Sequence, residues 1–187
     1  RKVGAVAKHF LGFHHSQGGI HAATCDIPER LLREVYAKPF QAAITEGGLK
    51  GIMPCYNAIN GEPVSGSRNI LTGLLREEMG FEGVTVSDYS AVSALYGRHK
   101  VTESPEEGAV RALWAGMDQE LPSRCCFNER LKEMFESGQA DMALLDRAVY
   151  DVLLRKFEQG LFEYPMAQPP QIIRKVYFNE DTMALSL

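Results

Sequence analysis

The sequence alternates short apolar segments with longer amphipathic ones, and this alternation constrains the fold more than any other feature. Apolar runs typical of buried strands lie at residues 3–7, 51–57, 84–88 and 117–121. Segments with helical spacing follow at about 28–46, 69–79, 91–96, 105–115, 128–137 and 141–159. Strands that alternate with helices pair in parallel through right-handed crossovers. We therefore expect an α/β fold built on a parallel sheet.

The helical segments also indicate which residues should form the core. The segment 28–46 has one apolar face and ends at Gly47 and Gly48. A second apolar face lies in the segment 69–79. The two faces comprise Leu31, Leu32, Val35, Tyr36, Phe40 and Ala43 in the first helix and Leu71, Leu74 and Leu75 in the second. Trp114 lies in the segment 105–115, and we expect its large ring to be buried on a helix face.

The number of strand–helix units suggests an architecture. Four units make about half of an eight-stranded (β/α)₈ barrel, which typically needs about 250 residues. An open, doubly wound sheet is the alternative for the same pattern. In either case the carboxyl ends of the strands carry the chemistry. Beyond Tyr164, the prolines at 165, 169 and 170 predict an extended tail.

Charge and motif content exclude several classes of function. The net charge of −4 argues against nucleic-acid binding, which needs a concentrated basic surface. No apolar run approaches the roughly 20 residues that span a bilayer. The glycine pairs at 18–19 and 47–48 lack the G-x-G-x-x-G context of a dinucleotide site. We therefore expect no nucleic acid, no membrane and no cofactor as partners.

The cysteines and the first residues bear on metal binding and localisation. The four cysteines, Cys25, Cys55, Cys125 and Cys126, show no C-x-x-C spacing, and an adjacent pair does not easily bridge to itself. This pattern argues against a metal site and predicts four reduced cysteines in or near a core, which favours a reducing compartment. The chain begins at Arg1 without an initiator Met or a signal core, so we expect a piece of a longer protein whose localisation stays unknown.

Polar side chains lie at the carboxyl end of each expected strand. They are Lys8 and His9, Tyr56, Asp88 and Glu120. Asp88 ends the apolar run V-T-V-S-D, where a carboxylate can act as nucleophile, base or metal ligand. Its alternative role is the N-cap of the following helix. Glu120 is either a second active-site carboxylate or a structural ion-pair partner.

The neighbouring residues allow a binding role as well as a structural one. Lys8 and His9 can donate hydrogen bonds to ligand hydroxyls or hold a carboxylate in its charged form, or they form a solvated pair. The hydroxyl of Tyr56 can orient a carboxylate, or Tyr56 is a core tyrosine with its tip in water. A loose histidine cluster at 14, 15 and 21 lacks the helical i, i+4 spacing of a zinc site.

Ordered motifs along nearly the whole chain resemble glycoside hydrolase family 3. The most diagnostic block is G-F-E-G-V-T-V-S-D-Y at 80–89. Further matching blocks lie, in the family's order and spacing, at 8–10, 18–22, 29–40, 53–61, 71–76, 115–122 and 154–162. The resemblance implies that residues 1–164 form the second half of a catalytic (β/α)₈ barrel. Residues 165–187 would then be the tail or linker towards a following domain.

The resemblance also implies roles for single residues. Asp88 matches the family's catalytic nucleophile, and Lys8 and His9 match a pair that binds hydroxyls of the sugar in the −1 subsite. Tyr56 matches the tyrosine beside the nucleophile. Tyr89 stands where many members have Trp, so the wall that faces the sugar differs in size and polarity. Two further candidates for the site are Met53 and Glu120.

The implied activity is retaining hydrolysis of terminal β-D-glucosides or β-D-xylosides through a glycosyl-enzyme on Asp88. No segment of the chain matches the family's acid/base, so we expect the isolated chain to be nearly inactive. A half barrel leaves open sheet edges, which predicts a homodimer or pairing with the missing half. The alternatives are a non-catalytic carbohydrate-binding relative and a different barrel enzyme that uses Lys8 for metal-dependent or Schiff-base chemistry.

Overall fold

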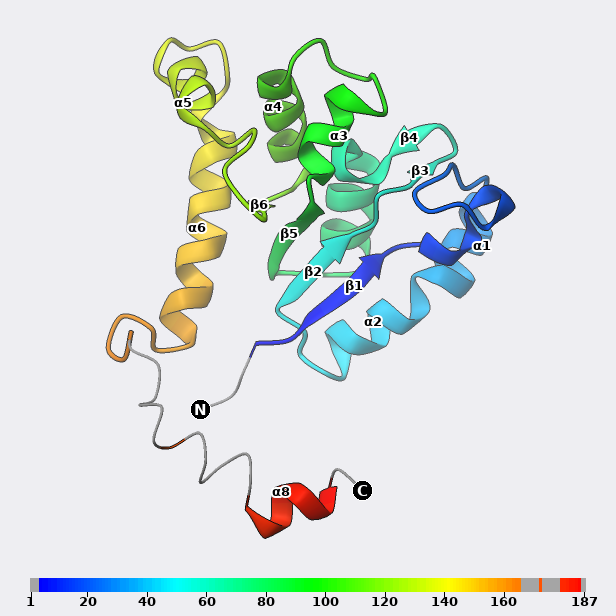
Figure 1. The fold of residues 1–187 in the computed structure, drawn as a ribbon, viewed down its shortest axis with the longest axis vertical. Helices are drawn as coiled ribbons and strands as arrows, with labels where there is room; N and C mark the ends of the chain where they lie inside the picture. Colours follow the sequence, from blue (N-terminus) through cyan, green and yellow to red (C-terminus); the bar gives the residue numbers. More distant parts are fainter. Residues whose placement is uncertain (1–3, 166–171, 173–178, 186–187) are drawn as a thin grey trace. The chain divides into compact units, whose positions relative to one another are not determined.

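Four parallel strands form the central sheet of the computed structural model, which describes residues 4–165, 172 and 179–185. The strands are β1 (Val6–Phe10), β2 (Gly51–Pro54), β5 (Val84–Tyr89) and β6 (Gln119–Leu121), in the spatial order β1-β2-β5-β6 (Figure 1). Each neighbouring pair is parallel. The expectation of an α/β fold with a parallel sheet is confirmed.

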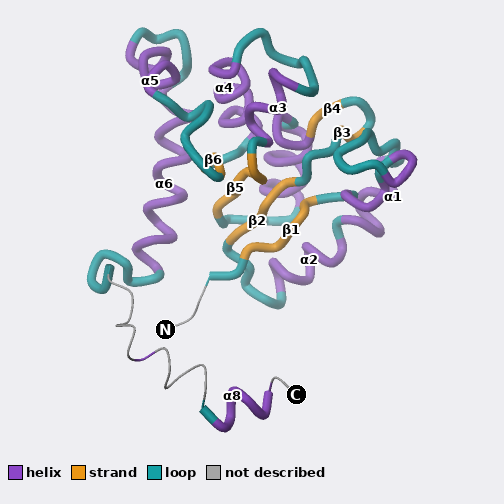
Figure 2. The backbone as a smooth tube through the Cα atoms, viewed as in Figure 1, coloured by secondary structure: helices purple, strands orange, loops and turns teal. Residues whose placement is uncertain are grey.

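Strand alternation gives the sheet two different faces. Ile52, Thr85 and Ser87 are fully buried on one of them. The opposite face holds Val6, which is 47% exposed, and the partly exposed Asp88. In the view of Figure 2 the helices between residues 29 and 155 lie beside and behind the sheet, and none of them crosses in front of it. We call the side of Val6 and Asp88 the open face.

Two register shifts lie at the carboxyl end of the sheet. In β1 and β2, Lys8 lies opposite Met53, and the register shifts between Lys8 and Phe10. In β5 and β6 the register shifts between Val86 and Tyr89, the segment that contains Asp88. Such irregularities redirect the side chains next to them.

The strand bounds differ from the expected ones in a way that affects the candidate residues. The first strand was expected at 3–7, but β1 continues through Lys8 and His9 to Phe10. These two residues therefore lie within β1 and do not follow it, and the register shift between Lys8 and Phe10 interrupts the regular alternation of faces there. The second strand was expected to reach residue 57. It ends at Pro54, so Tyr56 lies in the connection that follows it.

The region expected as one helix at 28–46 consists of three pieces. They are α1 (Glu29–Leu31), the π-helical η3 (Leu32–Tyr36) and α2 (Lys38–Thr45). Pro39 explains the break, because proline has no N–H to donate and its ring clashes with the carbonyl four residues earlier. The widened turn shows in the bond from the Ala37 N–H to the Leu32 carbonyl.

The expected apolar faces are correct only in part. Leu32 is buried, and Phe40 packs edge-on against Phe10, but Leu31 and Val35 are exposed because the π-helical turns rotate them away from the sheet. In the π-helical η5 (Asn69–Glu78), the expected core residues Leu71, Leu74 and Leu75 are buried.

The next four helices match the expected segments closely. They are α3 (Ala91–Gly97), α4 (Pro105–Ala115), α5 (Glu129–Glu136) and α6 (Met142–Glu158). Trp114 contradicts its expectation and is 45% exposed. The buried face of α4 is formed by Ala109, Ala112 and Leu113, so Trp114 projects from the other side, where the Arg68 guanidinium lies over its ring.

Short elements fill the connection that the sequence indicated as turn-rich. The hairpin of β3 (Ala58–Ile59) and β4 (Glu62–Pro63) is antiparallel, and 3₁₀ turns lie at Phe13–His15, Gln17–Gly19 and Val64–Gly66. Cys25 pairs with Ile59 through an isolated bridge. This bridge fixes the loop after β1 to the loop after β2.

The chain divides into two compact units, Arg1–Arg155 and Lys156–Leu187, and the expected domain boundary after residue 164 stays a prediction. In the second unit the rings of Phe157 and Phe162 lie 6.5 Å apart. Much of the expected extended tail at 165–187 lies outside the described residues. The described part includes the helix α8 (Glu180–Leu185), so the prediction of an extended tail is wrong for that segment. None of the described helices is long and apolar enough to span a bilayer.

Candidate active site

Asp88 lies at the carboxyl end of β5 with both carboxylate oxygens engaged. Oδ1 accepts the backbone N–H of Tyr89 at 2.7 Å, and Oδ2 lies 3.2 Å from Nε2 of His9. The side chain is 13% exposed, so it meets solvent from the open face. The residue at the N-cap of α3 is Ser90, with φ of 61°. The helix-cap interpretation of Asp88 therefore does not describe its geometry.

His9 reaches Asp88 from β1, across the intervening strand β2. Burial lowers the pKa of His9, the carboxylate of Asp88 opposes this effect, and Lys8 and His21 lower the pKa further. The ring is therefore neutral near pH 7, and its Nε2 can donate to Asp88 Oδ2 when it carries the proton. This arrangement fixes the carboxylate without neutralising its charge.

Tyr56 closes a second side of Asp88. Its hydroxyl donates to the carbonyl of Tyr89 at 2.8 Å. Burial, followed by the neighbouring carboxylate of Asp88, raises the pKa of Tyr56 to about 12. The hydroxyl stays protonated at neutral pH and can serve as a donor beside the carboxylate.

Arg98 and His99 lie behind Tyr56, and no pattern in the sequence singled them out. Nε2 of His99 lies 3.1 Å from the backbone carbonyl of Tyr56, and the Arg98 guanidinium donates to the carbonyl of His21 at 3.1 Å. The rings of His21 and Tyr56 meet edge to face with centroids 5.2 Å apart. Arg98 and His99 thus hold the backbones of two residues whose rings touch.

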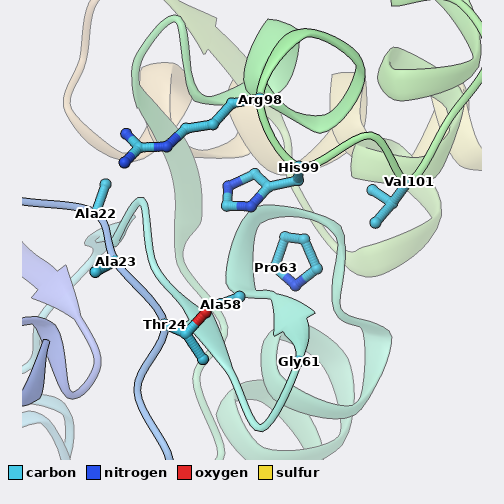
Figure 3. Close-up of a pocket in the computed structure, with 9 residues that line it drawn as sticks. All are labelled: Ala22, Ala23, Thr24, Ala58, Gly61, Pro63, Arg98, His99 and Val101. Atoms are coloured by element: carbon cyan, nitrogen blue, oxygen red, sulfur yellow. The ribbon is translucent and has the colours of Figure 1, made fainter. Parts of the chain in front are cut away.

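Figure 3 shows the cavity that Arg98 and His99 line, with a volume of about 390 Å³. The His99 ring lies above Pro63, and the Arg98 side chain extends towards Ala22. The other lining residues are Ala23, Thr24, Ala58, Gly61 and Val101. Asp88 is not among them, so this cavity lies behind the wall of the candidate site and does not contain the reactive group.

Lys8, Met53 and Tyr89 are further candidate residues of the site. Lys8 is exposed on β1, opposite Met53 in the register, and both lie on the same face as Asp88 by strand alternation. Tyr89 is 61% exposed and contributes its backbone to the site while its ring meets solvent. Tyr89 follows Asp88 directly, whereas among the described residues neither Lys8 nor Met53 forms a hydrogen bond or ion pair with the Asp88 carboxylate.

Glu120 lies on the other face of the sheet from Asp88. It is 8% exposed, and its carboxylate accepts the N–H groups of Cys126 and Phe127, each at 2.8 Å to Oε2. Alternation explains this placement, because Val86 on the open face pairs with Gln119, the residue before Glu120. Glu120 therefore anchors the loop after β6.

The histidine cluster separates in space. Nδ1 of His15 lies 2.7 Å from the Tyr36 hydroxyl, and the His14 ring also lies against Tyr36. His21 instead packs against the rings of Phe13 and Tyr56 at the candidate site. The structure thus brings together His9, Tyr56, Asp88 and the backbone of Tyr89, with His21 as an addition.

The four cysteines are free thiols. Cys25, Cys55 and Cys126 are buried, as expected, whereas Cys125 is exposed. Burial raises the pKa of Cys55 to about 12, so this thiol is neutral and acts as a small core residue.

Comparison with known proteins gives matches over nearly the whole chain. A β-xylosidase of Formosa agariphila is 36% identical over 174 residues, which are 90% of this chain and 24% of the relative. A β-glucosidase structure from Erythrobacter marinus aligns with a TM-score of 0.93 and 32% identity, over 99% of this chain and 24% of its own. A β-glucosidase from Listeria innocua in complex with glucose aligns with a TM-score of 0.82 and 33% identity, over 88% of this chain and 22% of its own.

The chain thus spans about a quarter of the length of these relatives. The model of the glycosyl hydrolase family 3 N-terminal domain matches residues 1–154. This match covers most of the chain and agrees with the order of the sequence motifs. The chain belongs to glycoside hydrolase family 3, and residues 1–154 match the family's N-terminal domain.

Proposed function

We propose that this chain is the nucleophile-bearing part of a retaining exo-acting β-glycosidase, with Asp88 as the nucleophile. The observation that carries the proposal is the geometry of its carboxylate. Tyr89 N–H and His9 Nε2 engage one oxygen each, and the group still meets solvent on the open face of the sheet. A carboxylate that is oriented but not paired with a fixed cation keeps its charge and its reactivity.

The reaction proceeds in two displacements. A carboxylate oxygen of Asp88 forms a bond to the anomeric carbon while the bond from that carbon to the leaving-group oxygen breaks, and a carboxylic acid protonates the leaving group. Water then attacks the same carbon, the bond to Asp88 breaks, and the second carboxylate takes the proton of the water. Lys8 and His9 bind hydroxyls of the sugar, and Tyr56 and Tyr89 form the wall beside it.

The acid/base comes from outside this chain. Retaining enzymes place their two carboxyl groups about 5–5.5 Å apart. Glu120 does not qualify, because it lies on the opposite face and its carboxylate is engaged by backbone N–H groups. The isolated chain therefore hydrolyses aryl β-glycosides barely or not at all.

Terminal β-D-glucosides and β-D-xylosides are the proposed substrates. Support comes from the relatives, which are a β-xylosidase and β-glucosidases, one of them in complex with glucose. The exposed ring of Tyr89 is a polar-tipped aromatic wall that suits either sugar.

The test is mechanism-based labelling of the full-length protein with 2-deoxy-2-fluoro-glucosyl and -xylosyl donors that carry dinitrophenolate. This leaving group needs no protonation, so the labelling step does not depend on the acid/base. Peptide mass spectrometry should find the sugar on Asp88, and Asp88→Asn should abolish the label. Labelling of another carboxylate, or borohydride trapping of a substrate-derived imine at Lys8, would overturn the assignment.

A further inference from the structure

A buried carboxylate without a cationic partner stands out on the side of the sheet away from Asp88. Glu120 is 8% exposed, and none of the described lysines and arginines forms an ion pair with it. Both of its oxygens accept the N–H of Cys126, and Oε2 also accepts the N–H of Phe127. Buried charges in proteins are usually paired or coordinate a metal ion. These two N–H groups orient the carboxylate, but they bring no counter-charge.

The loop after β6 brings two thiols to this carboxylate. The loop folds back so that Sγ of Cys125, Sγ of Cys126 and a carboxylate oxygen of Glu120 all lie within 4.8 Å of one another. Cys126 is buried, and Cys125 is exposed, so the group has one side open to solvent. Residue spacing does not indicate this group, because the group contains no C-x-x-C motif and one of its members lies at the end of a strand.

We propose that Glu120, Cys125 and Cys126 bind a thiophilic divalent cation of the Zn²⁺ class. Two sulfur ligands select a soft cation over Mg²⁺ or Ca²⁺, and three protein ligands with a water in the fourth position satisfy a tetrahedral ion. Zn–S and Zn–O bonds of about 2.3 Å and 2.0–2.2 Å require only a small contraction of the present spacing.

The charge of the group suits a cation, because metal binding requires deprotonated thiols and places positive charge beside the Glu120 carboxylate. Binding therefore releases thiol protons and strengthens as the pH rises.

The site lies apart from the proposed nucleophile. Strand alternation places Glu120 on the face opposite Asp88, so the cation has no direct access to the reacting sugar. Its effect is to fix the loop between β6 and α5, which Figure 1 shows running between these two elements. Metal binding and glycoside hydrolysis can consequently be tested separately.

The experiment titrates the reduced chain, kept in a non-thiol reductant, with ZnCl₂ by calorimetry and with CoCl₂ by absorption spectroscopy. We expect one equivalent of metal, a thiolate-to-cobalt charge-transfer band and proton release that depends on the buffer. Cys125→Ser replaces an exposed ligand and should weaken binding at least about tenfold with the fold intact by circular dichroism. Glu120→Gln keeps an oxygen for the loop N–H groups and should weaken binding as well.

Two controls separate this site from others in the chain. Cys25→Ala removes a buried thiol in another loop and should leave the stoichiometry and affinity unchanged. The double change His14→Gln and His15→Gln tests the histidines near Tyr36 and should also leave them unchanged. Binding that survives Cys125→Ser at full affinity, or that the histidine variant abolishes, would overturn the proposal, as would the absence of the charge-transfer band.

Discussion

At the scale of single residues, the candidate site depends on how each neighbour orients the Asp88 carboxylate and on how that carboxylate shifts the pKa of His9 and of Tyr56. The strand-end position of Asp88 and the polar residues at 8, 9 and 56 were readable from the sequence, because the carboxyl ends of parallel strands converge. Arg98 and His99 were not readable from the sequence, because they contact the backbone carbonyls of His21 and Tyr56. Every residue has a backbone carbonyl, so the type of the accepting residue does not indicate such a contact.

The mutual influence of His9 and Asp88 gives a prediction about titration. Burial lowers the pKa of His9, and the Asp88 carboxylate partly offsets this effect. Asp88→Asn should therefore lower the pKa of His9 further, which nuclear magnetic resonance of the imidazole Cε1 proton measures directly. The pKa of His99 is lowered mainly by burial and depends on Tyr56 and Arg98, so it should not move in the same variant. A rise of the His9 pKa in Asp88→Asn would contradict the arrangement.

The same shift has a consequence for stability. A histidine whose pKa is lower in the folded state than its ordinary value of 6.5 favours folding above that pH. The contribution is lost as the pH falls through the folded-state pKa. Urea unfolding of the wild type and of His9→Gln between pH 7 and pH 5, a range about that ordinary value, should show a steeper loss of stability for the wild type. Parallel curves would show that His9 is as easily protonated in the folded chain as in the unfolded one.

His99 allows a test of the contact behind Tyr56. His99→Phe fills the volume but leaves the Tyr56 carbonyl without its donor, which should cost about 1 kcal/mol of unfolding free energy because the site is only half-buried. His99→Gln retains an N–H donor of similar reach and should cost less. Chemical denaturation measures both. Equal losses in the two variants would assign the effect to packing and not to the hydrogen bond.

At the scale of elements, periodicity located nearly every helix and strand of the first unit, and the errors have identifiable causes. The helix at 28–46 breaks because Pro39 removes a hydrogen bond, a local effect that an apolar face conceals. Trp114 is exposed because small alanines, and not the largest residue, form the buried side of α4. β1 extends past its expected end because Lys8 and Phe10 still pair with Met53 and Pro54 of β2.

Asp118 joins elements whose association the sequence did not reveal. Its fully buried side chain accepts from Arg76 of η5 at 2.8 Å and from the N–H of Thr85 in β5 at 2.7 Å, and it pairs with Arg147 of α6. Three elements thus meet at one carboxylate. Removing a member of a buried ion-pair network is strongly destabilising because it leaves the partners without their counter-charge.

Asp118→Ala should therefore lower the free energy of unfolding by about 3 kcal/mol, at the low end of the range for buried pairs because Arg76 and Arg147 retain some access to water. Urea denaturation followed by circular dichroism measures the loss. Glu34→Gln, which breaks the exposed pair with Arg30, is the matched control and should cost less than about 1 kcal/mol. Similar losses in the two variants would show that the buried network contributes no more to the free energy of unfolding than an exposed ion pair does.

At the scale of the whole chain, the sheet is unusual for a parallel one. Parallel sheets are normally covered on both faces, yet in the view of Figure 2 no helix between residues 29 and 155 crosses in front of the sheet, and Val6 on the open face is 47% exposed. Within the described residues, β1 pairs only with β2 and β6 only with β5, so both edges are unpaired. An open face and two open edges are what half of a barrel exposes. They support the proposal that further strands complete a barrel. Periodicity alone had left an open, doubly wound sheet as the alternative.

The first unit should therefore associate through the edge of β1, either with a second copy or with the missing half. Val6 is 47% exposed on this edge strand. Val6→Lys places a charge where another strand would pair and should shift the chain from dimer to monomer in sedimentation velocity. Val35→Lys is the matched control, because Val35 is 52% exposed but lies on the π-helical η3. Its association should equal that of the wild type. A wild-type chain that is folded and monomeric over the whole concentration range would contradict edge pairing. Equal loss of association in both variants would instead assign the contact to general apolar exposure.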